Sequence, residues 1–192
     1  MRRYAIFLGI GIILWPTIGQ PAAAASFTPG ERERQDAIAV GRRSVVSEEF
    51  GAEWRARNAS GETLIVMTPF HRLALAARNA AFKGEALKPK DIDNAVKETG
   101  GKLTVWVTLK GGTPDFARFY APLLLDGKTE IKPSFVQNER TALRAEDGAY
   151  AARCLYVFPA AGLSGTGRFT LVVRNPDDKE VSTFTVDLSA MR

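Results

Sequence analysis

Alternation of apolar and polar residues with a period of two dominates the C-terminal half of the chain. Between Leu103 and Leu109 every second residue is large and apolar, with threonines and Trp106 in the intervening positions. This pattern is typical of a strand that buries one face and exposes the other. Residues 150–158 are apolar on both faces apart from Arg153. They therefore predict a strand in the middle of a sheet.

Short runs of turn residues divide other apolar segments into hairpins. Asp126-Gly127 is the strongest of these signals, because both residues tolerate the positive φ that a two-residue turn requires. Pro122 and Pro133 lie on either side of it, and proline within strands is confined to sheet edges and bulges. The expected hairpins pair residues 53–58 with 62–68, 118–125 with 128–136, and 168–174 with 180–188.

Apolar residues at helical spacing predict three helices. The sequence from Thr28 to Glu31 has the form of a capping box and predicts a helix over about residues 29–49. Thr68-Pro69 begins a second helix, which Gly84 ends, and a third covers about residues 90–99. The positions expected to be buried in the second and third helices are Phe70, Leu73, Ala77, Ile92, Ala95 and Val96.

About eight strands joined by short turns favour antiparallel pairing, because parallel strands need long crossover connections. The chain is therefore predicted to be mainly β: an antiparallel β-sandwich of immunoglobulin-like general plan, with an N-terminal helix and a two-helix excursion between strands. We expect a helical segment over 26–51 and the sandwich over 52–192, with the helical insertion at 69–99. Cys154 is the one cysteine, so the disulfide of antibody domains is absent and a buried thiol is expected.

The first 25 residues have the features of a secretory signal peptide. Arg2 and Arg3 precede an apolar run of 12 residues, which is shorter than the about 20 residues of a membrane-spanning helix. Alanines 22 to 25 supply a signal peptidase site, and we expect cleavage after Ala25. The protein should then be periplasmic or secreted, with no stable membrane insertion. An uncleaved leader that acts as a membrane anchor is the alternative.

The charge of the chain is mild and mixed. The leader carries two of the 26 basic residues and none of the 21 acidic ones, so the net charge after cleavage is +3. Basic and acidic residues also alternate locally, as between Glu31 and Arg34, which is typical of a solvated helix face. We therefore expect no nucleic-acid partner, since such binding needs a strongly basic surface.

The sequence indicates no catalytic constellation. His71 is the one histidine, which excludes a zinc site built from several histidines. Ser164 lies in a glycine-rich loop, but Thr166 stands where a hydrolase nucleophile elbow requires glycine. We therefore name no catalytic residue, metal or cofactor.

Two tryptophans are the candidate binding residues. Trp106 lies on the polar face of its strand, and Trp54 lies in a segment rich in arginine. Either helices cover these rings, or the rings form a recognition surface. The sequence favours an exported, non-catalytic binding or accessory domain for an unknown envelope protein or polymer. The alternative is a periplasmic hydrolase whose site combines dispersed acidic residues with His71.

Overall fold

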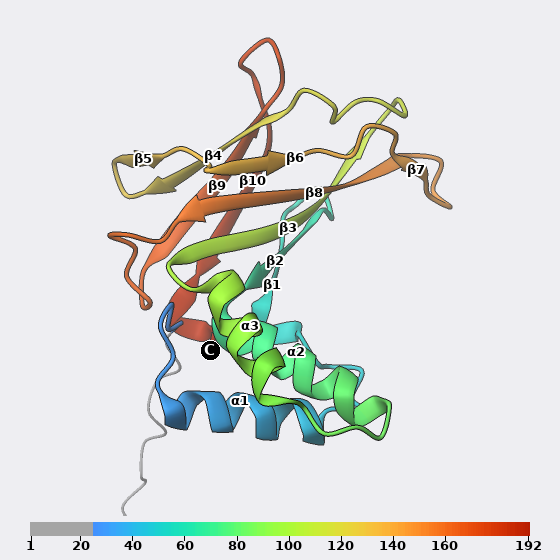
Figure 1. Ribbon diagram of the computed structural model, residues 1–192. Helices are drawn as coiled ribbons and strands as arrows, with labels where there is room; N and C mark the ends of the chain where they lie inside the picture. The colour runs from blue at the N-terminus through green and yellow to red at the C-terminus, as the bar shows by residue number, and fades with distance from the viewer. Residues whose placement is uncertain (1–24) are drawn as a thin grey trace, which may run out of the picture.

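The computed structural model describes residues 25–192, so the signal peptide predicted over residues 1–25 lies outside the described residues apart from Ala25. Within the described part the chain forms ten strands and three α-helices (Figure 1). The helices are α1 (Glu31–Arg43), α2 (Pro69–Phe82) and α3 (Pro89–Thr99), with two short 3-10 helices, η1 (Ala52–Trp54) and η2 (Leu188–Ala190). The strands are β1 (Arg55–Arg57), β2 (Thr63–Met67), β3 (Lys102–Gly111), β4 (Ala121–Asp126), β5 (Thr129–Ile131), β6 (Phe135–Gln137), β7 (Leu143–Arg144), β8 (Tyr150–Pro159), β9 (Arg168–Arg174) and β10 (Glu180–Asp187).

The strands form two antiparallel sheets. The six-stranded sheet has the order β1-β2-β3-β8-β6, with β7 also paired to β8, and the four-stranded sheet has the order β10-β9-β4-β5. Every strand pair in both sheets is antiparallel. The predicted fold class, a mainly β antiparallel sandwich of immunoglobulin-like general plan, is confirmed.

The core lies between the two sheets. Alternate residues of β3 and β8 are at most 1% exposed, and these are Leu103, Val105, Val107, Leu109, Ala152, Cys154, Tyr156 and Phe158. The four-stranded sheet contributes Phe169, Leu171, Val173, Phe184 and Val186 to the same core. The buried thiol predicted for Cys154 is confirmed, and its burial raises the pKa of that thiol.

The three helices lie together at one end of the sandwich (Figure 1). As predicted, α2 begins after Thr68, whose hydroxyl oxygen accepts a hydrogen bond from the His71 backbone N–H at 3.0 Å. It ends just before Gly84, which has a φ of +70°. Helix α1 packs on α2 through Gly41, where an added Cβ would lie 2.1 Å from the Ala74 carbonyl oxygen. None of the helices in residues 25–192 is both long and apolar enough to cross a bilayer.

The predicted bounds and cap of the first helix are wrong. Its N-cap is Gly30, whose N–H donates to the Glu33 carboxylate at 2.7 Å, so Thr28 and Glu31 do not form the capping box. The helix ends at Arg43 instead of continuing to about residue 49. Beyond that end the Arg78 guanidinium donates to backbone carbonyl oxygens, at 2.9 Å for Ser44, and this favours a non-helical turn.

The strand predicted over residues 128–136 divides between the two sheets. Its first part is β5 in the four-stranded sheet, and its end is β6 in the six-stranded sheet. Pro133 lies between them and donates no backbone hydrogen bond, so it interrupts the ladder. The following segment, 138–148, contains the two-residue strand β7.

Candidate binding surface

The outward face of the six-stranded sheet has Trp106 at its centre. In the sheet register Trp106 lies opposite Ile65 of β2 and Leu155 of β8. All three side chains are half-buried, and none belongs to the hydrophobic core or packs against it. Of the two interpretations that the sequence left open for Trp106, the structure therefore does not place this ring in the core.

Neighbouring rows extend the apolar part of this surface. Met67, Thr104 and Val157 form the adjacent row, and Phe135 of β6 lies opposite Val157 with 49% of its surface exposed. We call this surface the Trp106 face; its apolar members are Ile65, Met67, Trp106, Phe135, Leu155 and Val157.

Arginines border the Trp106 face. The Arg153 guanidinium carbon lies 5.7 Å from the centroid of a Trp106 ring, which is a cation–π geometry. Arg55 lies opposite Ile65 and Arg57 opposite Thr63, and both arginines are exposed. The face therefore combines an apolar centre with a cationic margin on rigid strands.

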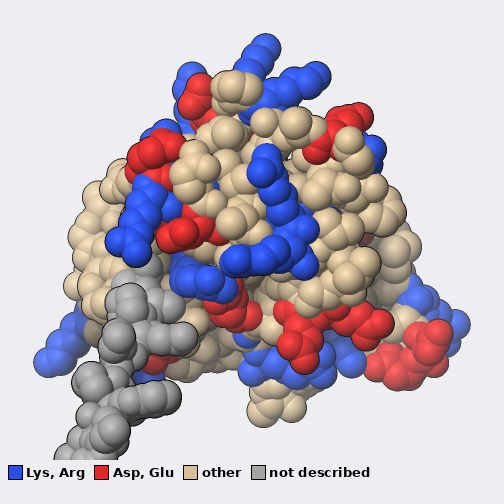
Figure 2. All heavy atoms as spheres, turned by 90° about the horizontal axis from the view of Figure 1, so that it is seen from below, with Lys and Arg blue, Asp and Glu red and all other residues tan. Residues whose placement is uncertain are grey.

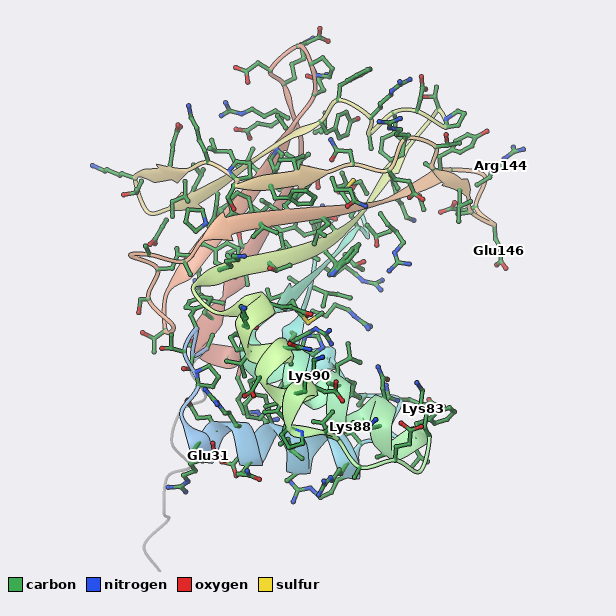
Figure 3. The ribbon with its side chains drawn as sticks, viewed as in Figure 1. Glu31, Lys83, Lys88, Lys90, Arg144 and Glu146 are labelled. Carbon is green, nitrogen blue, oxygen red and sulfur yellow. The ribbon has the colours of Figure 1, made fainter. Side chains whose placement is uncertain are left out.

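Charged side chains are also present at both ends of the molecule. Figure 3 shows Lys83, Lys88 and Lys90 at the helical end, and Arg144 of β7 and Glu146 just after it at a tip far from the helices. Figure 2 views the helical end, where basic and acidic side chains are interspersed over the visible part. That end presents charges of both signs side by side.

Trp54, the second candidate binding residue, is buried. Its side chain is 1% exposed, and its indole N–H donates to the Arg192 carbonyl oxygen at 2.7 Å. The ring packs against Phe50 and Phe70 at centroid distances of 5.9 and 6.2 Å. Trp54 is therefore a core residue with no surface to offer a partner. The sequence named both tryptophans as candidate binding residues, but the structure leaves only Trp106 in that role.

His71 is also enclosed. Its side chain is 5% exposed, and its Nδ1 lies 2.9 Å from the Val66 carbonyl oxygen. Burial lowers the pKa of the imidazole. The negative charge of nearby Glu53 acts in the opposite direction on this pKa, and Glu53 itself forms an ion pair with Arg192 at 2.9 Å. Among residues 25–192 no group of three or more histidine, cysteine, aspartate and glutamate side chains is arranged to hold a metal ion.

A buried carboxylate that sequence reasoning missed connects the two sheets. Glu62 is 5% exposed and accepts hydrogen bonds from the Asn58 amide at 2.6 Å, the Ser182 hydroxyl at 2.5 Å and the Lys110 backbone N–H at 2.9 Å. Asn58 also donates to Ser182, across the gap between β1 and β10. The short spacing of Asn58 and Glu62 was visible in the sequence, but Ser182, 120 positions away from Glu62, was not an evident partner. Because all its donors are internal, this carboxylate holds the sheets together.

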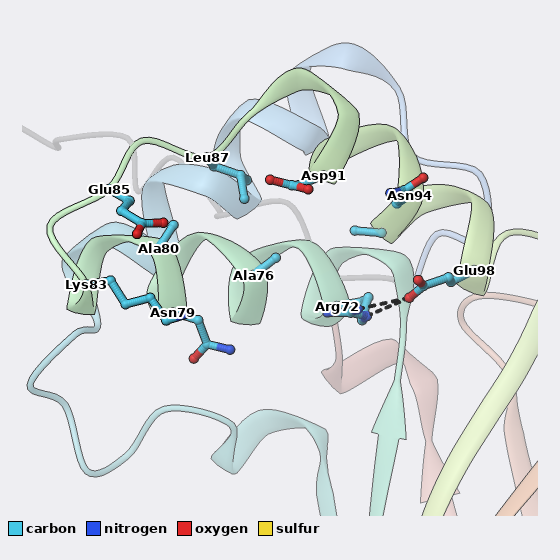
Figure 4. A pocket seen from close by; sticks show the side chains of 11 residues that line it. Arg72, Ala76, Asn79, Ala80, Lys83, Glu85, Leu87, Asp91, Asn94 and Glu98 are labelled. Carbon is cyan, nitrogen blue, oxygen red and sulfur yellow. Dashed lines mark hydrogen bonds and ion pairs between the residues drawn. The ribbon is translucent and has the colours of Figure 1, made fainter.

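A groove of about 290 Å³ lies between α2 and α3 (Figure 4). Arg72 and Glu98 form an ion pair of 2.9 Å at one end, and Lys83 and Glu85 lie at the other. Charges of both signs line it, so the groove favours no charged ligand over its opposite.

Comparisons with known proteins identify no family. No family model matches the chain, and no curated protein matches it. Among solved structures, the chain is similar to a novel protein of unknown function from Burkholderia pseudomallei K96243, with 8% identity and a TM-score of 0.42 over 85% of this chain and 95% of that one. It is also similar to IgNAR antibody domain C3, with 15% identity and a TM-score of 0.32 over 52% of this chain and 86% of that one. Likenesses at this level carry no inference about function.

Proposed function

We propose that this protein is an exported, non-catalytic binding domain that recognises an envelope protein or polymer through the Trp106 face. The observation that carries the proposal is the half-buried Trp106 ring among apolar neighbours that do not pack against the core. Rigid aromatic rings and arginines contribute most of the binding energy in many interfaces. The Trp106 face offers both on adjacent strands.

The strands that carry the Trp106 face are held firmly by the core beneath them. Val105 and Val107, on either side of Trp106 in the sequence, are 0% and 1% exposed. A surface fixed in this way loses little conformational entropy when a partner binds. The position of Trp106 therefore suits recognition without rearrangement.

The surroundings of His71 favour a binding domain over the hydrolase alternative. A general base must reach the proton that it removes, whereas the His71 ring is 5% exposed and stacks on Trp54. Its Nδ1 faces a backbone carbonyl oxygen, and the neighbouring Glu53 is paired with Arg192. These contacts describe a structural histidine.

Site-specific crosslinking in the envelope tests this proposal. A photo-reactive residue at Thr108, beside Trp106 on the same face, should give a discrete adduct in cells, and the Trp106→Ala substitution should abolish that adduct. The same photo-reactive residue at Lys90, on exposed α3, is the matched control and should give none. An adduct from Thr108 that persists after Trp106→Ala, or no adduct from Thr108 at all, contradicts the proposal.

A further inference from the structure

A second surface, which adjoins the Trp106 face, lies beside the edge strand β6. Arg118, Phe119, Val136, Gln137, Asn138 and Arg140 line a pocket of about 380 Å³ there. Phe119 is 69% exposed and Val136 is 40% exposed. Large apolar side chains with this exposure around a concave site are typical of interaction surfaces. We call this site the β6 pocket.

The charge of the β6 pocket has one sign. Arg118 and Arg140 line it, and no acidic side chain is among its lining residues in the described chain. Neither arginine forms an ion pair within residues 25–192. The Arg118 guanidinium carbon lies 5.2 Å from the Phe119 ring centroid, so a cationic and an aromatic side chain lie side by side in the pocket wall. This arrangement complements carboxylates.

One side chain fixes the geometry of the pocket. The Asn138 amide donates to the Tyr120 carbonyl oxygen at 2.8 Å, and its oxygen accepts from the Tyr156 hydroxyl at 3.0 Å. Asn138 thereby connects the end of β6 to the loop that carries Arg118 and Phe119, and to the buried ring of Tyr156. The pocket walls are therefore held together before any ligand arrives.

The backbone beside the pocket is a free sheet edge. Strand β6 ends the order of the six-stranded sheet, and its three residues are all exposed. Where β6 and β7 leave part of β8 uncovered, the Glu139 carboxylate accepts from the Arg153 backbone N–H at 2.6 Å. The edge of β8 is thus closed by a side chain, whereas the edge of β6 remains available to another polypeptide backbone.

We propose that the β6 edge binds an extended acidic polypeptide segment by strand addition, with its carboxylates on Arg118 and Arg140 and an apolar side chain against Phe119 and Val136. In this mode backbone hydrogen bonds give affinity, and pockets for alternate side chains give specificity. The free backbone edge favours a polypeptide over an anionic polysaccharide, which offers no strand. This inference does not depend on the Trp106 face.

Fluorescence anisotropy with a labelled peptide of alternating glutamate and valine residues tests the strand-addition proposal. Residues 25–192 should bind it saturably. Arg118→Glu and Arg140→Glu should each weaken binding by about tenfold or more. Arg32→Glu makes the same charge change at an exposed position of α1, away from the pocket, and should leave the affinity unchanged. Both arginines of the pocket are exposed, so circular dichroism should show the variants folded.

Three further probes separate the possible outcomes. An N-methylated version of the peptide keeps the charges but lacks backbone donors, and it should bind about tenfold more weakly. A lysine–valine peptide should not bind. Equal binding of either analogue, absence of saturable binding up to about 1 mM, or displacement of the peptide by heparin fragments at equal affinity would overturn the proposal. The last result would assign the pocket to an anionic polysaccharide.

Discussion

The indole of Trp54 stacks on the imidazole of His71, with ring centroids 4.1 Å apart and planes 4° from parallel. Trp54 belongs to η1 and His71 to the first turn of α2. The indole N–H donates to Arg192, and the Thr68 hydroxyl donates to the same carbonyl oxygen at 2.6 Å. The stack therefore joins η1, α2 and the chain near Arg192 in one buried cluster.

His71 should make the stability of the protein depend on pH. Its folded-state pKa lies below the ordinary value of about 6.5, because burial disfavours the charged imidazolium. Between the two pKa values the unfolded chain binds a proton that the folded chain does not, so the free energy of unfolding falls as the pH falls below about 6.5. Urea unfolding at a series of pH values from about 7.5 to 5.5 should show a decreasing midpoint.

His71→Gln is the control for this pH dependence. It removes the one histidine of the chain, and its unfolding midpoint should change little over the same range, whatever its absolute stability. An NMR titration of wild-type His71 that gives a pKa above about 6.5 would contradict the sign of the effect.

The two tryptophans should respond differently to truncation. Trp54→Ala opens a cavity in the core and removes one of the two hydrogen bonds to the Arg192 carbonyl oxygen, so it should cost about 3–5 kcal/mol of unfolding free energy. Trp106 lies on the half-buried outer face, so Trp106→Ala should lower the unfolding free energy by about 1 kcal/mol or less. The same substitution should weaken the binding of a partner by about 2 kcal/mol or more. Denaturant unfolding measures the change in unfolding free energy for both variants. A loss of stability at Trp106 as large as that at Trp54 would sink the assignment of its ring to a binding surface.

The contrast between Trp106 and Trp54 shows what the sequence could predict. Trp106 lies in a ten-residue strand whose alternation fixes its facing, and the buried residues on both sides of it confirm that facing. Trp54 precedes a strand of only three residues, and the atom that its indole binds is 138 positions away. Local periodicity carries no information about such a contact.

The same reasoning explains the first helix and the β6 pocket. The end of α1 depends on Arg78, more than 30 positions away, and the Thr-Pro-Gly-Glu pattern predicted a cap two residues too early. The pocket forms because Asn138 and the loop carrying Phe119 meet at a sheet edge. The hydrophobic pattern alone does not predict the division of residues 128–136 between two sheets. It also does not predict the contact between Asn138 and the loop that carries Phe119.

Gly41 should tolerate no side chain. In an exposed helix interior, replacing glycine by alanine stabilises the helix by up to about 1 kcal/mol. At Gly41 the new Cβ would lie 2.1 Å from the Ala74 carbonyl oxygen and 2.9 Å from the Ala77 Cβ. We expect Gly41→Ala to destabilise the protein instead, by about 1–3 kcal/mol, because α1 must move away from α2.

Thermal unfolding compares Gly41→Ala with Gly112→Ala, where an added Cβ meets no atom within 4 Å. The control should leave the melting temperature nearly unchanged. If the melting temperature of Gly41→Ala rises, the close packing of α1 on α2 is wrong.

Ala25 should be the first residue of the exported protein, one residue earlier than the sequence pattern alone indicates. Its N–H donates to the carbonyl oxygens of Gly165 at 3.0 Å and Leu188 at 3.3 Å, and its side chain is 4% exposed. A free ammonium at Ala25 would have a separate hydrogen for each of these two acceptors. Cleavage after Ala24 satisfies the Ala-x-Ala requirement of signal peptidase as well as cleavage after Ala25 does.

Intact-mass measurement of protein purified from the periplasm distinguishes these products, which differ by one alanine. The Gly165→Val substitution provides a structural check, because its Cβ would lie 1.9 Å from the Ala25 carbonyl oxygen. It should displace the N-terminal segment and lower the melting temperature if Ala25 is retained. A chain that begins at Ser26 and is insensitive to Gly165→Val would contradict this prediction, and a membrane-bound chain that keeps its leader would contradict export as well.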